Sequence, residues 1–421
     1  MQAPASSLTP VVALKPGYAD RNRAYWRRNL AVCVFGSFTT LVSLSMLLPF
    51  LPLYVAQLGV KEPAQIVQWS AIAFGATFFG TAITAPLWGR LADRYGRKPM
   101  LVRAALGMAV VMSMLGLAEN VTQLVLLRLA AGLIGGYASA SIVMIGTQAP
   151  GERAGWALGV LSTGALAGNL AGPLIGGFLP GLVGIRGTFF VGGAMIVVAA
   201  AATIFLIRED FDRGTDAKRR PATDGPRTAA GQGGILAVLL VSAMMVLLAN
   251  MSIEPIITIY IGHLGVPEHS QARVAGIVMA ASALGSMLTA PRLGALADRI
   301  GSWNVIIGCL AATALVMVPQ AWVTEWWQLA VLRGIMGMTI AGLLPSIAKL
   351  VRQAVDEHQS GRTLGYLQSA QFSGQVVGPL LGSQIAAYAG LRQVFWVTAL
   401  LLLGCAALNR WAARRARAAS V

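Results

Sequence analysis

The sequence predicts an all-α polytopic membrane protein, in which twelve transmembrane helices form two pseudo-symmetric bundles of six. Composition is the first observation, because 56% of the 421 residues are hydrophobic and only 11% are charged, which leaves too little polar surface for a water-soluble globule. The second is the grouping of apolar residues into runs of about 20, the length of a membrane-spanning helix. The third is an internal repeat: a polar segment at 89–99 returns in weaker form at 294–302, and a Thr-Ala-Pro tripeptide precedes each copy.

The apolar runs set the expected bounds of the helices and domains. We place the helices at 30–54, 67–88, 100–118, 121–147, 156–180, 187–207, 235–261, 273–293, 304–322, 328–351, 362–388 and 393–410. The two bundles then span residues 29–207 and 235–410. An N-terminal tail at 1–28, a charged linker at 208–234 and a basic tail at 411–421 complete the chain.

The positions of the basic residues predict the orientation. A net charge of +16 would suggest nucleic acid if the charges shared one soluble face. Most lysines and arginines instead fall in the tails, the linker and the loops on the side of the two termini, whereas the other side has only Lys61, Arg186, Arg273 and Arg392. Because basic loops stay in the cytoplasm, we expect both termini to be cytoplasmic and no nucleic acid to bind.

Helices one and seven carry matched prolines, Pro49 and Pro255. A proline inside a helix frees a carbonyl group and kinks the helix, and membranes tolerate this where a neighbouring helix or a water-lined cavity satisfies that group. We expect both helices to line a cavity; a kink with no further role is the alternative.

The segment between helices two and three is interpreted as a gating motif. Gly96 suits a turn with positive φ, Gly89 suits a close approach of two helices, and Asp93 is placed to meet a helix N-terminus or an arginine of the other bundle. A solvated basic loop is the alternative, and the repeat favours the gating interpretation. The motif comprises Gly89, Asp93, Arg94, Gly96 and Arg97, with Asp298 and Arg299 in the second copy.

Helix four contains Arg128, and helix ten repeats its surroundings around Arg333. A charged side chain inside a span costs roughly 2.5 kcal/mol or more, so it normally faces a partner or a cavity. We expect Arg128 to be the stronger candidate for such a role. Snorkelling of its guanidinium to the membrane surface is the alternative.

Helices five and eleven carry glycines four residues apart, which let another helix pack closely against them. The helix-packing motif of helix five is Gly168, Gly172, Pro173 and Gly176. We expect cysteine pairs on helices five and eleven at the outer side to trap one transport state.

Uncharged polar residues inside several spans indicate a substrate cavity. Three glutamines share one face of helix eleven, and an asparagine stands at the matching position of helix five. Hydrogen bonding between helices is the alternative. The expected cavity residues are Asn169, Asn250, Gln368, Gln371 and Gln375.

Glu254 is the only one of the 16 acidic residues well inside a predicted span. A carboxyl group within a membrane helix marks a proton or ion pathway by default. We expect Glu254 to load a proton from outside and release it inside, with Arg128 favouring its ionised form when the two approach. The alternative is a permanently protonated acid that hydrogen-bonds a carbonyl freed by Pro255.

Together these segments resemble the major facilitator superfamily, and within it the twelve-helix drug:proton antiporters. Residues 89–99 are similar to the superfamily signature between helices two and three, 128–132 to its helix-four motif, and 164–177 to the antiporter motif of helix five. Residues 49–52 resemble the proline motif of helix one. Several relatives carry an acid in helix one, whereas this chain has none between residues 31 and 59, so the proton pathway does not transfer directly.

The resemblance implies alternating-access export of amphipathic drugs or other small toxic molecules across the bacterial inner membrane, in exchange for protons. It implies no enzyme activity, catalytic residue, cofactor or metal, with the proton gradient as energy source and a monomer embedded in the lipid bilayer as the working form. Two alternatives stay open: an exporter of a specific metabolite, sugar or peptide, and a membrane sensor that does not transport.

Replacing Asp93 with Asn should slow export with little loss of folded protein, because the residue is interpreted as a latch that accepts hydrogen bonds when the inner side closes. The matched change Asp298→Asn should have a smaller effect. Export rates normalised to folded protein test this, and the prediction fails if Asp93→Asn is either silent or simply not expressed.

Overall fold

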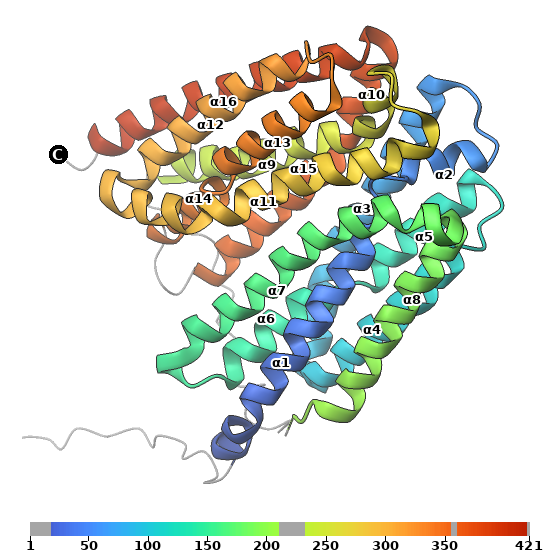
Figure 1. The fold of residues 1–421 in the computed structure, drawn as a ribbon. Coiled ribbons are helices and arrows are strands. Elements are labelled where there is room, and N and C mark those ends of the chain that lie inside the picture. Colours follow the sequence, from blue (N-terminus) through green and yellow to red (C-terminus); the bar gives the residue numbers. More distant parts are fainter. Residues whose placement is uncertain (1–17, 210–231, 355–359, 419–421) are drawn as a thin grey trace, which may run out of the picture.

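The computed structural model describes residues 18–209, 232–354 and 360–418, which are almost entirely helical. The elements are α1 (Tyr18–Ser45), α2 (Leu51–Gln57), α3 (Pro63–Tyr95), α4 (Arg97–Leu115), α5 (Val121–Ile134), α6 (Tyr137–Gln148), α7 (Gly151–Phe178), α8 (Pro180–Leu206), α9 (Gln232–Ile253), η2 (Glu254–Ile256), α10 (Ile257–His263), α11 (Glu268–Ile300), α12 (Ser302–Gln320), α13 (Trp326–Ile340), α14 (Leu343–Gln353), α15 (Ser360–Ala389) and α16 (Leu391–Ala418). They form two bundles, α1–α8 and α9–α16, which lie one above the other in Figure 1. The predicted all-α fold of two related halves is confirmed.

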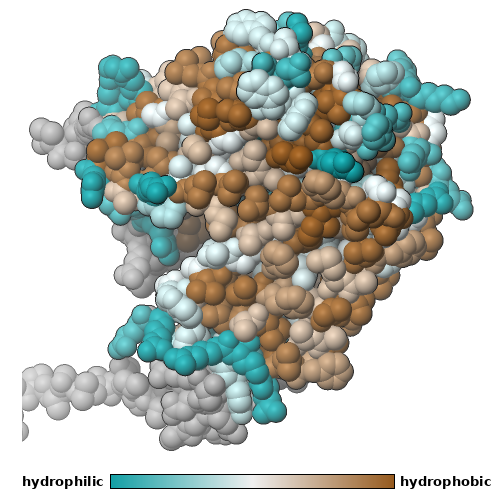
Figure 2. Space-filling model, viewed as in Figure 1, coloured by the Kyte–Doolittle hydropathy of each residue, from teal (hydrophilic) through white to brown (hydrophobic). Residues whose placement is uncertain are grey.

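The described helices include eleven stretches that are long and apolar enough to cross a membrane. The eleventh predicted crossing, α15, is not among them, because its polar face of glutamines and serines lowers its hydropathy. Large hydrophobic side chains such as Phe79, Leu182, Phe205 and Leu315 are exposed, and brown apolar surface extends over both halves in Figure 2. Such a surface suits contact with lipid rather than with water.

Several helices extend beyond the apolar runs that predicted them. α1 already begins at Tyr18, within the predicted tail at 1–28, and α16 continues to Ala418 through most of the predicted tail at 411–421. α3 runs to Tyr95 through most of the segment expected to be a loop. Hydropathy marks where the bilayer ends, whereas helical hydrogen bonds continue into water, so the two boundaries differ. Residues 1–17 of the tail and 210–231 of the linker lie outside the described residues.

Single glycines make the two turns of the repeated motif. Gly96 separates α3 from α4 with φ of 92°, and Gly301 separates α11 from α12 with φ of 89°. A residue with a side chain is strained at such angles, whereas glycine is not. The predicted turn is present, and it is one residue long.

Four crossings are discontinuous: the first, fourth, seventh and tenth. The breaks lie at 46–50, at 135–136, at 254–256 and at 341–342. The prolines had predicted a kink in the first and seventh crossings. The breaks in the fourth and tenth were not predicted, although the glycine pair at 135–136, where Gly136 has φ of 110°, permits one. Broken helices leave backbone groups free at membrane depth, which is where transporters build their sites.

Glycines bring the helices of each half into backbone contact. Gly168, Gly172 and Gly176 of α7 lie against α1, and a Cβ added at Gly176 would collide with the Met46 carbonyl. The same arrangement recurs in the second half, where Gly382 of α15 faces the Ser252 carbonyl of α9. Without a hydrophobic driving force between helices in lipid, such close packing supplies much of the attraction.

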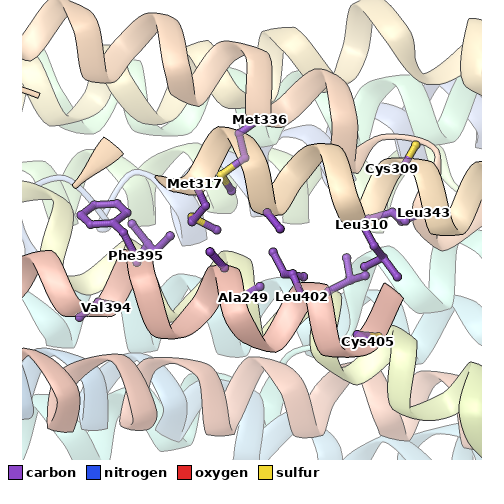
Figure 3. Packing of buried hydrophobic residues seen from close by; sticks show 14 of the residues in the cluster. Ala249, Cys309, Leu310, Met317, Met336, Leu343, Val394, Phe395, Leu402 and Cys405 are labelled. Atoms are coloured by element: carbon purple, nitrogen blue, oxygen red, sulfur yellow. The ribbon is translucent and has the colours of Figure 1, made fainter. Parts of the chain in front are cut away.

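Each half has its own apolar core. Figure 3 shows part of the second core, where Leu310 and Met317 of α12, Met336 of α13 and Leu402 of α16 point toward one another. The three cysteines, Cys33, Cys309 and Cys405, are buried and free, in accord with their interpretation as small hydrophobic residues.

The two halves meet on the side opposite the termini and diverge toward the termini (Figure 1). α7 packs against α11 and α3 against α15, and we call these contacts the opposite-side seam. Here the Arg273 guanidinium lies 5.3 Å from the centre of the Phe178 ring, and the Thr258 hydroxyl donates a 2.8 Å hydrogen bond to the Pro49 carbonyl. The structure is therefore closed on the opposite side.

Helices five and eleven, which were expected to carry the cysteine pairs that trap one transport state, each pack against a different helix at the seam. The fifth crossing, α7, packs against the eighth, α11, and the eleventh, α15, packs against the second, α3. Most of the glycines in the two motifs face helices of their own half.

A double variant with cysteines at Phe178 and Arg273 should become trapped in the closed state by a short bifunctional thiol reagent, because the two side chains meet across the seam. Transport should then stop and recover when the crosslink is reduced. A crosslink between cysteines at Trp26 and Trp156, whose rings are 6.3 Å apart within one half, is the control that should leave transport intact. Undiminished transport through the Phe178–Arg273 crosslink would exclude opening at this seam.

Candidate functional site

Glu254 and Arg333 form a buried ion pair at the break of the seventh crossing. Glu254 is the first residue of η2, and Arg333 lies on α13 of the same half. Nη2 of Arg333 donates a hydrogen bond to Oε1 of Glu254 at 3.0 Å. The side chain of Arg333 is 0% exposed and that of Glu254 is 9% exposed. A charge removed from water requires such a partner, because an isolated buried ion is strongly unfavourable.

The far side of Arg333 is held by weaker contacts. Its Nη1 donates to the Met336 sulfur at 3.6 Å, and Nε2 of Gln320 reaches the same sulfur at 3.7 Å. The Tyr260 hydroxyl in turn donates to the Gln320 carbonyl at 2.9 Å. These contacts connect α10, α12 and α13, and they fix the guanidinium beside the carboxylate.

Two polar atoms of the pair have no hydrogen-bond partner in the described part of the chain. They are Oε2 of Glu254 and Nε of Arg333. An ionised carboxylate accepts hydrogen bonds on both oxygens, so Glu254 uses only part of its capacity. The unoccupied oxygen is an available position for a proton.

Arg128, the expected partner of Glu254, lies elsewhere. It is buried in the first half, where its Nε donates a 3.3 Å hydrogen bond to the Ala73 carbonyl, and its guanidinium lies 5.9 Å from the centre of the Phe74 ring. α3 packs against α5, which carries Arg128, and also contacts η2, which carries Glu254. The residue in contact with Glu254 is Arg333, the repeat partner of Arg128.

A signal for Arg333 was present in the sequence. The segment Arg333–Gly337 repeats Arg128–Gly132, and Arg333 belongs to the same half as Glu254. Membership of one bundle is a better guide to contact than the strength of a motif, because most helix contacts in this structure lie within a half.

The expected cavity residues are not joined to one another. Asn169 of α7 and Gln368 of α15 are exposed, whereas Asn250, Gln371 and Gln375 are partly buried. Among the described residues none of their carboxamides has a hydrogen-bond partner. Interhelical hydrogen bonds from these carboxamides, the predicted alternative, are absent among the described residues, and their role in a substrate cavity stays a prediction.

An acid that was not predicted to belong to the gating motif caps the helix that follows it. The carboxylate of Glu209 accepts hydrogen bonds from the backbone N–H groups of Arg97 (2.9 Å) and Lys98 (2.6 Å) at the start of α4. A carboxylate stabilises a helix N-terminus, where N–H groups lack partners. Glu209 was predicted to lie in the linker. Its position as the first acid after the sixth crossing was the only signal in the sequence, and its contact with α4 depends on the fold.

The other motif residues have varied surroundings. The side chain of Asp93 lies outside the described residues. Arg97 donates through Nη1 to the Thr147 hydroxyl at 3.2 Å. The close approach of two helices expected at Gly89 is absent, because a Cβ added there would meet no neighbour within 4 Å. In the second copy Asp298 pairs with Lys349 of α14 at 2.6 Å. Arg94 and Arg299 are exposed near the ends of α3 and α11.

No group of three or more metal-binding side chains occurs within residues 18–209, 232–354 and 360–418.

Comparison with known proteins identifies relatives along the whole chain. A family model described as Major Facilitator Superfamily matches residues 33–267 and 239–421. Multidrug resistance protein MdtG of Proteus mirabilis is 38% identical over 391 residues, covering 92% of this chain and 95% of the relative. The protein of the same name from Citrobacter koseri is 40% identical over 378 residues, covering 90% and 93%.

Two solved structures share the fold at low sequence identity. A bacterial homologue of the human lysosomal transporter Spinster, in an inward-facing and occupied conformation, superposes with a TM-score of 0.73 at 16% identity, over 93% of this chain and 97% of that one. A variant of the nucleoside transporter NupG gives 0.70 at 12% identity, over 90% and 99%.

The Glu254–Arg333 pair predicts a non-additive pattern of stability. Glu254→Leu leaves a buried guanidinium without a partner and should lower the free energy of unfolding by about 3–5 kcal/mol. The double variant Glu254→Leu/Arg333→Leu should regain most of this lost stability, because no unpaired charge remains. Melting temperatures of the purified variants measure this. Arg128→Leu is the matched control, and combining it with Glu254→Leu should give no recovery. Additive losses in the Glu254/Arg333 cycle would contradict the pairing.

Proposed function

The chain belongs to the major facilitator superfamily, and from this membership we propose that it exports amphipathic drugs in exchange for protons, with Glu254 as the proton carrier. The observation that carries the proposal is the burial of Glu254, the only buried Asp or Glu among the described residues, in an ion pair with Arg333. Relatives named multidrug resistance protein, 38–40% identical over most of the chain, support drugs as the exported class.

The position of Glu254 near the opposite-side seam supports its role. Its turn, η2, contacts α3 of the other half, and Thr258 just beyond it donates its hydrogen bond across the seam to Pro49. Separation of the halves on this side breaks that hydrogen bond and admits water to the turn. Exposure of Glu254 is thereby coupled to the conformational state.

The proposed exchange follows from this coupling. When the opposite side is open, a proton binds the Glu254 carboxylate, removes its charge and weakens its attraction for Arg333. When the opposite side closes and the terminus side opens, the proton leaves and the ion pair reforms. The described structure, closed on the opposite side with the pair intact, corresponds to the end of this step. No cofactor is required, since the proton gradient supplies the energy.

The proposed substrate is uncharged or weakly charged and amphipathic. The free carboxamides of Asn250, Gln371 and Gln375 offer both donors and acceptors, and each half adds flexible methionines. Adaptable apolar surface with few fixed charges suits binding of varied molecules. We propose that the chain works as a monomer in the bacterial inner membrane with both termini cytoplasmic, so that the opposite side is the outer side.

Replacing Glu254 with Gln should abolish drug-induced proton movement in inverted membrane vesicles while drug binding persists, because glutamine keeps the shape but does not ionise. Glu268→Gln, which changes an exposed acid at the start of α11, is the control and should behave as wild type. Full proton-coupled export by Glu254→Gln would exclude this carrier. Drug binding without any flux in the wild-type protein would favour a sensor instead.

A further inference from the structure

A cavity lies on the side opposite the termini, and neither Glu254 nor Arg333 lines it. Its volume is about 570 Å³, within the range of small-molecule sites. The first turn of α3 contributes Pro63, Ala64 and Val67, and the other half contributes α10 and the junction of α15 with α16. The cavity therefore exists between the halves and takes walls from both.

The chemistry of its walls is amphipathic and basic. Val67, Ile259 and Leu264 provide apolar surface, while His263 and Arg392 bring nitrogen donors, and no acidic residue lines the cavity. Arg392 is exposed, its guanidinium lies beside the Tyr260 hydroxyl, and it forms no salt bridge with another described residue. A guanidinium without a carboxylate, beside apolar walls, is complementary to an anionic head group joined to an apolar chain.

The first half provides a comparison. Arg186 is the repeat partner of Arg392, and its Nη2 donates to the Ala118 carbonyl at 3.3 Å. Gln57 stands where the second half has His263. Each arginine also lies beside a matched tyrosine, Tyr54 or Tyr260, so the arginine is common to both halves and His263 is the basic residue that the second half adds.

The location makes the cavity dependent on the transport state. Its α3 wall belongs to the first half, and separation of the halves at the opposite-side seam carries that wall away from α10 and α16. A ligand in the cavity contacts both halves only while the seam is closed. By linkage, a ligand that binds one state stabilises it.

We propose that this cavity is a regulatory site for an amphipathic monoanion, a phosphate or carboxylate with one short apolar chain, and that its occupation holds the opposite side closed and slows export. Arg392 binds the anionic group, and the wall around Val67 holds the chain. The site is separate from the proposed proton carrier, so its test does not depend on proton coupling.

Binding of octyl phosphate to the wild-type protein in phosphatidylcholine nanodiscs, with empty nanodiscs subtracted, tests the site. Octylammonium and inorganic phosphate should each bind at least about tenfold more weakly, because one has the wrong charge and the other lacks the chain. Arg392→Gln should weaken octyl phosphate binding by about tenfold or more, whereas Arg186→Gln should leave it unchanged. Equal affinities of these two variants would overturn the proposal.

A second pair of variants covers the case in which Arg392→Gln does not fold. Ala64→Trp fills the cavity from the α3 side and should abolish binding, whereas Gln65→Trp, at the exposed neighbouring position, should not. Unchanged binding by Ala64→Trp would also overturn the proposal. Nanodiscs containing phosphatidylglycerol identify the source of the ligand: competition with octyl phosphate points to a lipid head group, and its absence points to a soluble amphipath.

The dependence of the cavity on the closed seam is tested by binding to crosslinked protein. Protein crosslinked between cysteines at Phe178 and Arg273 should bind octyl phosphate at least as tightly as uncrosslinked protein, because the seam is held closed. Loss of binding in the crosslinked state would refute the link between this cavity and closure.

Discussion

Hydrocarbon offers no hydrogen bonds, and this constraint shapes the whole molecule. Every backbone N–H and C=O within the bilayer must be satisfied inside the protein, so the described chain is built from helices. The same constraint confines irregular backbone to places shielded from lipid. The four broken crossings form two repeat pairs, the first with the seventh and the fourth with the tenth, and the break at Glu254 carries the single buried acid among the described residues.

Close helix packing follows from the same absence of solvent. Glycines at repeated positions put α7 against α1, α15 against α9, and the pairs α3–α5 and α11–α13 into backbone contact. Gly132 faces the Thr77 carbonyl, and Gly337 faces the Ser282 carbonyl in the other half. Backbone contacts of this kind also cross the seam, where a Cβ added at Gly276 would collide with the Pro173 carbonyl, but more of them lie within each half.

The duplication is nearly complete in packing but not in charge. Both halves retain the buried arginine of the fourth and tenth crossings, yet only Arg333 has an acid, because Leu48 stands at the repeat position of Glu254. Arg128 is left with a carbonyl and an aromatic ring. Arg186 and Arg392, on the side opposite the termini, each lie beside a matched tyrosine, but only Arg186 donates to a carbonyl while Arg392 borders a cavity. The two halves therefore share a scaffold and differ in the partners of a few charged side chains.

The sequence by itself determined the membrane fold, the number of crossings, the duplication, the glycine turn at Gly96 and the unusual position of Glu254, because hydropathy, repeats and glycine requirements are local properties of the chain. It did not determine the breaks in the fourth and tenth crossings, the partner of Glu254, the cap that Glu209 provides for α4, or the pairing of α7 with α11. These depend on contacts between residues far apart in the chain. Arg128 and Arg333 have almost the same local sequence, so only the bundle in which each is packed decides which guanidinium meets the carboxylate.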